Sequence, residues 1–189
     1  KEVLECWGSG TTARLITGLL CGLNYSFSLD GDASLSKRPM ERLLHHLRQV
    51  GACLQYNGKL PIISRPSDHL TYGNFIIKNA SAQIKTSLML YSLLQNGTST
   101  IKCNLPTRDH LEILLDYLNF PVKLIGRKII INGSIHSNVG FNICLPGDIS
   151  SAAFIIAASI LLKGSNITLK NILINEHRMG FINVLLKMG

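Results

Sequence analysis

The chain has 189 residues, of which 46% are hydrophobic and 16% charged, and this apolar content is ample for one large packed domain or two modest ones. Its net charge of +8 suits nucleic acid, a membrane surface or a small polyanion, but the basic residues are scattered and no aromatic stripe accompanies them, which argues against nucleic acid. The longest apolar stretch, residues 152–162, is too short to cross a bilayer, so we expect no membrane partner.

The first part of the chain alternates helical and extended patterns. In the second predicted helix the apolar residues recur at helical spacing, at Met40, Leu43, Leu44, Leu47 and Val50. The predicted elements are, in order, a helix over 11–21, a strand over 25–29, a loop over 31–37, a second helix beginning at Pro39 and capped by Gly51, and a hairpin over 53–63 turning at Asn57-Gly58.

The next part repeats this plan. The predicted elements are a strand over 75–77, a helix over 81–94, a strand over 100–103, a helix over 109–119, and a hairpin of strands 122–125 and 128–131. A third copy starts at Phe141 and stops after its second helix, without its hairpin. Each copy therefore reads βαβαββ, and we expect residues 150–189 of the incomplete copy to be frayed.

Polar residues recur in phase with this plan, seventy residues apart. Each helix start carries a hydroxyl, and each second helix follows an arginine; the two series are Thr11, Ser81 and Ser151, and Arg38, Arg108 and Arg178. A repeat of this length is one supersecondary unit packed on its copies. Hydroxyls at helix starts and arginines both suit anions, so the spacing indicates architecture and ligand together.

The chain ends and the cysteines indicate whether the chain is part of a longer protein and in which redox compartment it lies. The chain begins inside a predicted strand without a starting Met and stops at a helix end, so we expect a piece of a longer protein. The five cysteines form no CxxC pair, and most lie in apolar contexts, which predicts buried free thiols in a reducing compartment. We expect a soluble, cytoplasmic monomer. The dispersed histidines make no metal-ligand spacing, so no metal site is expected.

Several segments before helices could carry chemistry, and each also has a purely structural reading. The segment from Gly8 to Arg14 suits an anion, but alone it is as well explained as a helix cap. In Ser81-Ala82-Gln83-Ile84-Lys85 the serine could be an N-cap and the lysine solvated. Arg38, before a helix started by Pro39, suits a carboxylate, while Thr107-Arg108-Asp109-His110 and 145–151 could be capping clusters.

Taken together, these segments resemble the 5-enolpyruvylshikimate-3-phosphate synthase family (3-phosphoshikimate 1-carboxyvinyltransferase). The matching motifs follow the family's order: Ser-Gly-Thr-Thr-x-Arg at 9–14, Gly-Asp-x-Ser-Leu-x-x-Arg-Pro-Met at 31–40, Ser-Ala-Gln-x-Lys at 81–85, Thr-Arg-Asp-His at 107–110 and Pro-Gly-Asp-Ile-Ser-Ser-Ala at 146–152. The resemblance implies an α+β fold (an α/β prism) of repeated βαβαββ units, with about two and a half copies here. Residues 1–142 would form two units of one domain, and 143–189 the truncated first unit of the next.

The resemblance also implies roles for particular residues. Ser81, the backbone N–H of Ala82, and Arg108, assisted by Thr107, would hold the phosphate of shikimate 3-phosphate. Arg38 would bind phosphoenolpyruvate, with Gly10, Thr11 and Arg14 lining that side. Gln83 would lie between the two substrates, and Gln83 and Arg38 would be the catalytic residues of this segment. No metal or organic cofactor is implied, and the space at Gly10 goes with sensitivity to glyphosate in this family.

The chain departs from the family pattern at Gly8, where an Asn is usual, and at the preceding Trp7. The family's other acid-base and charge-stabilising residues lie outside this segment, so we expect the chain alone to bind weakly and not to turn over. Three alternatives stay open. They are the UDP-N-acetylglucosamine enolpyruvyl transferases, which have a Cys where this chain has Asp32-Ala33-Ser34, the RNA 3′-phosphate cyclases, whose nucleotide-binding signature is not seen here, and a non-catalytic anion-binding remnant of the fold.

Overall fold

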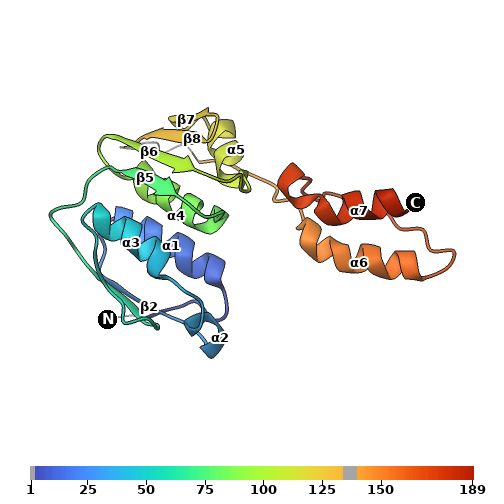
Figure 1. Cartoon of the computed structure of the whole chain (residues 1–189), viewed down its shortest axis with the longest axis horizontal. Coiled ribbons are helices and arrows are strands. Elements are labelled where there is room, and N and C mark those ends of the chain that lie inside the picture. The colour runs from blue at the N-terminus through green and yellow to red at the C-terminus, as the bar shows by residue number, and fades with distance from the viewer. Residues whose placement is uncertain (1–2, 134–139) are drawn as a thin grey trace. The chain divides into compact units, whose positions relative to one another are not determined.

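The computed structural model describes residues 3–133 and 140–189, and the chain divides into two compact units, residues 1–136 and 137–189 (Figure 1). The first unit contains two four-stranded sheets. The strands of the first sheet are β1 (Val3–Glu5), β2 (Phe27–Asp30), β3 (Cys53–Gln55) and β4 (Ile62–Arg65), and those of the second are β5 (Asn74–Ile77), β6 (Thr98–Cys103), β7 (Val122–Ile125) and β8 (Lys128–Asn132).

The two sheets have the same topology. Their strand orders are β1-β2-β4-β3 and β5-β6-β8-β7. In each sheet the first two strands pair in parallel across a helical crossover, and the remaining pairs are antiparallel. Two complete βαβαββ repeats are therefore present in the first unit, as the sequence predicted.

The helices of the two repeats are α1 (Gly10–Gly22), α2 (Ala33–Ser36), α3 (Glu41–Gln49), α4 (Ala82–Leu93) and α5 (His110–Tyr117). Helices α1, α3 and α4 lie between the two sheets (Figure 1). The strands present alternate residues to this layer, as Phe27 and Leu29 do on β2. Helix α3 buries Leu43, Leu44 and Leu47 in the same core. One hydrophobic core thus joins both repeats.

Helices α1 and α4 approach each other very closely. A Cβ atom on Gly18 of α1 would lie 2.2 Å from the backbone oxygen of Ser87 on α4, so only glycine fits there. The Ser87 hydroxyl donates a hydrogen bond to the Arg14 carbonyl oxygen (2.6 Å). Small residues Ala13 and Thr17 complete the buried face of α1. This contact fixes one repeat on the other.

Two local predictions in the first repeat were wrong. The expected loop over 31–37 contains helix α2, because the Asp32 carboxylate accepts a hydrogen bond from the Leu35 N–H (2.7 Å) and Leu35 is buried. The predicted hairpin forms, but strands β3 and β4 are joined by residues 56–61 rather than by a two-residue turn at Asn57-Gly58. Pro61 has no N–H for the ladder, so β4 starts only at Ile62.

The cysteines are free, and Cys6, Cys21 and Cys103 are buried as predicted. Burial raises the pKa of the Cys21 thiol to about 12. The expectation was wrong for Cys53 and Cys144, which are exposed. Cys53 lies at one end of β3, a strand whose outer positions face solvent. No helix in the described part of the chain is long and apolar enough to cross a membrane.

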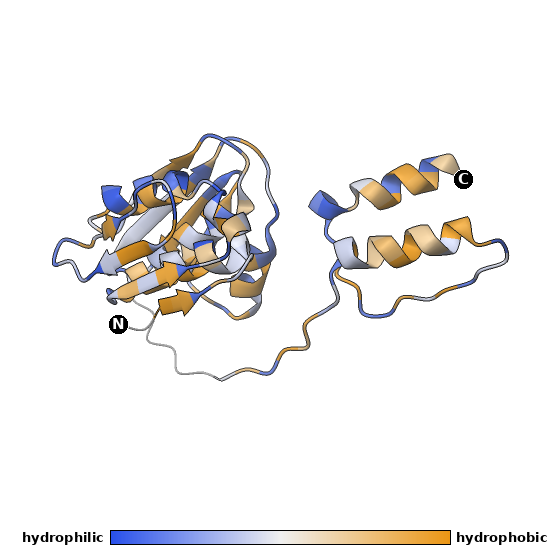
Figure 2. Cartoon of the chain, turned by 90° about the horizontal axis from the view of Figure 1, so that it is seen from below, coloured by the Kyte–Doolittle hydropathy of each residue, from blue (hydrophilic) through white to orange (hydrophobic). Residues whose placement is uncertain are grey.

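The second unit contains α6 (Ile149–Leu161), a 3-10 helix (Glu176–Arg178) and α7 (Gly180–Met188). Its expected strands are replaced, within residues 140–189, by an isolated parallel bridge between Gly147 and Ile172. Apolar residues run along both helices (Figure 2), yet large side chains such as Phe154 (79% exposed) and Leu186 (75%) are not covered. One isolated bridge does not make a sheet, so the apolar side chains of the two helices stay exposed in this unit. Fraying of residues 150–189 stays a prediction.

The close approach of α1 and α4 makes Gly18→Ala a test of the fold. The added methyl group would press on the Ser87 backbone, which cannot move without separating the helices, so we predict a loss of at least about 2 kcal/mol in the free energy of unfolding. Urea denaturation followed by circular dichroism measures it. Gly180→Ala is the control, because a Cβ there meets nothing within 4 Å. Equal stability of the two variants would contradict the packing.

Candidate anion-binding site

The starts of α1 and α4 form the centre of the site. Ser9 caps α1 by accepting the Thr12 N–H (3.2 Å), and Ser81 caps α4 by accepting the Ile84 N–H (3.3 Å). Both serines therefore act as helix caps, the structural reading of these motifs. The positive ends of two helix dipoles lie here, in adjoining repeats, and both favour a negatively charged ligand.

A chain of side-chain hydrogen bonds joins the two helix starts. The Arg14 guanidinium donates from Nη1 to the Gln83 side-chain oxygen (2.7 Å), and the Gln83 amide nitrogen donates to the Thr11 hydroxyl (2.7 Å). Arg14 also donates to the carbonyl oxygens of Gly10 and Pro39 (both 3.2 Å). Three predicted residues, Thr11, Arg14 and Gln83, are thus brought together from two repeats.

Arg38 joins this group at Gly10. A Cβ atom on Gly10 would lie 2.7 Å from Nη1 of Arg14 and 3.1 Å from Nη1 of Arg38, so the absence of a side chain lets both guanidinium groups stand over the helix start. Burial lowers the pKa of Arg14, and repulsion by Arg38 and Arg42 lowers it further. Crowded like charges of this kind are relieved by an anion.

A cavity of about 290 Å³ opens beside this group, between α1, α4 and the start of α5. Its lining includes Thr11, Ala82, Gln83 and Arg108, four of the predicted residues. The neighbouring Thr107 hydroxyl oxygen is buried and has no hydrogen-bond partner in the described structure. Donors from both repeats therefore border one cavity, whereas Ser81 and Arg38 are not among its lining residues.

Lys85 was expected to be solvated if Ser81 acts as a cap, and this expectation was wrong. Its ammonium group is buried, forms an ion pair with Glu112 of α5, and donates to the Arg108 carbonyl oxygen (2.6 Å). The sequence motif contained the lysine but gave no sign of its partner. Its partner Glu112 lies 27 residues away in the first turn of α5, and nothing in the sequence links the two residues.

The third repeat shows how its arginine and helix start meet a carboxylate. Asp148 caps α6 by accepting the Ser151 N–H (3.1 Å), and Arg178 donates to the same carboxylate (2.8 Å). These contacts, the hydrogen bond from Arg178 foremost, lower the pKa of Asp148. The corresponding caps of the first two repeats are Ser9 and Ser81. The caps of α1 and α4 are therefore uncharged, whereas the cap of α6 is a carboxylate.

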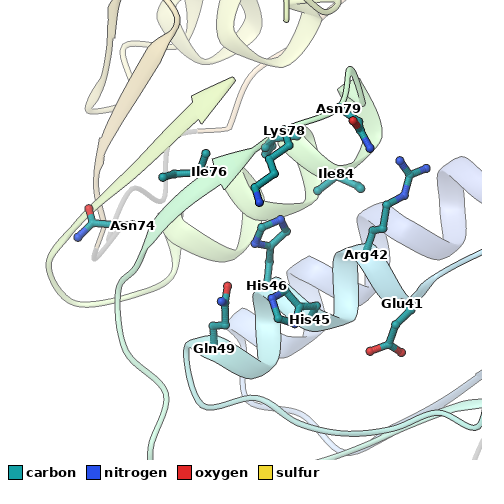
Figure 3. A pocket seen from close by; sticks show the side chains of 11 residues that line it. Glu41, Arg42, His45, His46, Gln49, Asn74, Ile76, Lys78, Asn79 and Ile84 are labelled. Atoms are coloured by element: carbon teal, nitrogen blue, oxygen red, sulfur yellow. The ribbon is translucent and has the colours of Figure 1, made fainter. Parts of the chain in front are cut away.

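A second cavity, of about 610 Å³, lies between α3 and β5 (Figure 3). It is lined by Arg42, His46 and Lys78, among others, and contains none of the predicted site residues. Burial lowers the pKa of His46, so its ring is neutral near pH 7. In the described part of the chain, no group of three or more His, Cys, Asp or Glu residues could hold a metal ion.

The two βαβαββ repeats define an α+β repeat protein in which a cluster of cationic and polar side chains joins the helix starts of both repeats. The EPSP synthase (3-phosphoshikimate 1-carboxyvinyltransferase) family matches the chain over residues 1–189. The chain belongs to this family.

Curated relatives agree with this assignment. The 3-phosphoshikimate 1-carboxyvinyltransferases of Clostridium tetani and Legionella pneumophila are 39% and 38% identical over 100% of this chain, which covers 43% and 44% of their lengths. A solved EPSP synthase from Acinetobacter baumannii is 37% identical, with a TM-score of 0.86 over 100% of this chain and 43% of its own. The predicted family and fold class are confirmed, and the chain spans less than half the length of these relatives.

Proposed function

We propose that this chain forms part of an enzyme that transfers the enolpyruvyl group from phosphoenolpyruvate to shikimate 3-phosphate, in the biosynthesis of chorismate and the aromatic amino acids. The observation that carries the proposal is the family match over the whole chain. The cationic site supports it, because both substrates are multiply charged anions. The match favours this reaction over the UDP-N-acetylglucosamine transfer considered from the sequence.

The second repeat would hold shikimate 3-phosphate. In this proposal Ser81, the N–H of Ala82 and the Arg108 guanidinium bind its phosphate, with the Thr107 hydroxyl assisting. The cavity lined by Ala82 and Arg108 supports this assignment, as does the unpartnered Thr107 hydroxyl. A helix start supplies oriented N–H donors, and the guanidinium supplies a planar pair of donors for phosphate oxygens.

The first repeat would hold phosphoenolpyruvate. Arg38 and Arg14 stand at Gly10 with no carboxylate paired to either among the ion pairs of the described residues. Their charge would neutralise the carboxylate and phosphate of this substrate, with Thr11 lining the same side. Gln83, which is hydrogen-bonded to both Arg14 and Thr11, would lie between the substrates and align them.

The remaining parts of the proposal concern the whole enzyme. Since the chain spans less than half of its relatives, we propose that residues 1–142 belong to one domain and 143–189 begin the other. The chain alone would bind weakly without turnover, because proton transfer and charge stabilisation need groups beyond those present here. The enzyme would act as a cytoplasmic monomer, without a metal or organic cofactor.

Calorimetric titration of the chain with shikimate 3-phosphate tests this function. We expect saturable binding that Arg108→Ala weakens by about tenfold or more, since a charge-assisted hydrogen bond contributes about 1.5–3 kcal/mol. Arg127→Ala is the matched control, because Arg127 is an exposed arginine of the β7–β8 turn. A folded chain that does not bind at millimolar ligand, or equal binding by the Arg108 variant, would refute the assignment.

Glyphosate is the second test, made on the complete enzyme. We expect it to slow enolpyruvyl transfer by competing with phosphoenolpyruvate for the Arg14 and Arg38 guanidinium groups over Gly10. Gly10→Ala should reduce this inhibition, because the added Cβ would lie within 3.1 Å of both guanidinium groups. The measurement is the initial transfer rate against inhibitor concentration. An unchanged rate in the unsubstituted enzyme would count against the proposed sensitivity.

A further inference from the structure

We propose that Lys85 is a positioning residue that sets the Arg108 backbone for phosphate binding, an inference that rests on the proposed function. Lys85 lies in the first turn of α4, and Arg108 lies in the segment before α5. The Lys85 ammonium spans the two, donating to the Arg108 carbonyl oxygen (2.6 Å) and pairing with Glu112. Lys85 thus connects Arg108 to helix α4. In the proposed function Arg108 and the start of α4 bind the same phosphate group.

The burial of this pair argues for a role beyond stability. The side chains of Lys85 and Glu112 are only 4% and 8% exposed. Removing two charges from water is costly, and well-packed apolar residues often stabilise such a place as well or better. The ammonium has three N–H donors, and beside Glu112 it donates to the Arg108 carbonyl oxygen. The pair thus fixes a specific backbone atom, which an apolar core would not do.

The segment around Arg108 contains buried polar atoms that have no hydrogen-bond partner among the described residues, which makes the contact from Lys85 important for its conformation. The hydroxyl oxygen of Thr107, Nε2 of His110 and Oε2 of Glu112 are buried without hydrogen-bond partners in the described structure. Unsatisfied polar atoms weaken a local conformation. The bond from Lys85 therefore matters more for residues 107–110 than it would in a segment whose polar atoms were all paired.

Lys85 does not itself reach the ligand cavity. It is absent from the lining of that cavity, which contains Ala82, Gln83 and Arg108, and its ammonium is directed at a backbone carbonyl and a carboxylate. Nearby Cys103, the last residue of β6, is also buried and interacts electrostatically with both charges. Lys85 would thus act through Arg108 and not on the substrate.

The test compares Lys85→Met, which keeps the stem but not the charge, with the double variant Lys85→Met/Glu112→Gln, which leaves no buried lone charge. Lys102→Met, an exposed lysine of β6, is the control. Amide hydrogen exchange, which needs no ligand, should rise at residues 107–110 in both Lys85 variants and stay unchanged in the sheet. Unchanged exchange at 107–110 in both variants, or a uniform rise over the whole unit, would overturn the proposal.

Affinity for shikimate 3-phosphate gives the second readout. We expect Lys85→Met to weaken it by about tenfold, the loss expected when one charge-assisted hydrogen bond from Arg108 is no longer aligned. The double variant should stay weak even where its stability recovers. In an Arg108→Ala background the Lys85 substitution should add little, because the two act as one unit. The role of Lys85 would be merely structural if its effect on affinity added fully to that of Arg108→Ala. The same would follow if the Lys85→Met/Glu112→Gln variant bound with full affinity. Absence of binding by the unsubstituted chain would refute the proposed function, while the exchange result would still decide the conformational role of Lys85.

Discussion

The close contact between α1 and α4 is the constraint on which the site depends. Gly18 lets α1 meet the Ser87 backbone directly, and the Ser87 hydroxyl then bonds the carbonyl of Arg14, one turn earlier on α1. This contact sets the helix starts side by side. Only at that separation can the Arg14 guanidinium reach Gln83 across the repeat boundary. The packing of two helices therefore determines the geometry of a polar site at their ends.

Charge then decides what such a site can accept. In the third repeat the protein's own Asp148 meets both the helix start and the repeat arginine. The first two repeats have the uncharged caps Ser9 and Ser81 in its place, and Arg14 and Arg38 crowd together at Gly10, with no carboxylate paired to either among the ion pairs of the described residues. Burial lowers the pKa of Arg14, and repulsion by the neighbouring Arg38 and Arg42 lowers it further. An external anion can supply what Asp148 supplies internally.

The sequence predicted the repeat well because its signals are local or periodic. Helix spacing and the recurring order of elements depend on nearby residues or on simple counting. The exact seventy-residue phase does not hold in detail, because Ser81 caps α4 whereas the caps of α1 and α6 are Ser9 and Asp148. The helix at 33–36 was missed because it depends on one cap and one buried leucine. The burial of Lys85 was missed because its partner Glu112 lies on another helix, and no local pattern reports such a pairing. The roles of the site residues came from family resemblance and stay predictions.

The central claim is that residues of two repeats form one anion site. The most direct measurement is a titration of the isotope-labelled chain with shikimate 3-phosphate, followed by two-dimensional NMR of backbone and arginine N–H groups. The account predicts shifts at Ala82, Gln83 and Arg108 and, through the hydrogen bonds of Gln83, at Thr11 and Arg14. Shifts confined to one repeat, or centred on the α3–β5 cavity at His46, would contradict it.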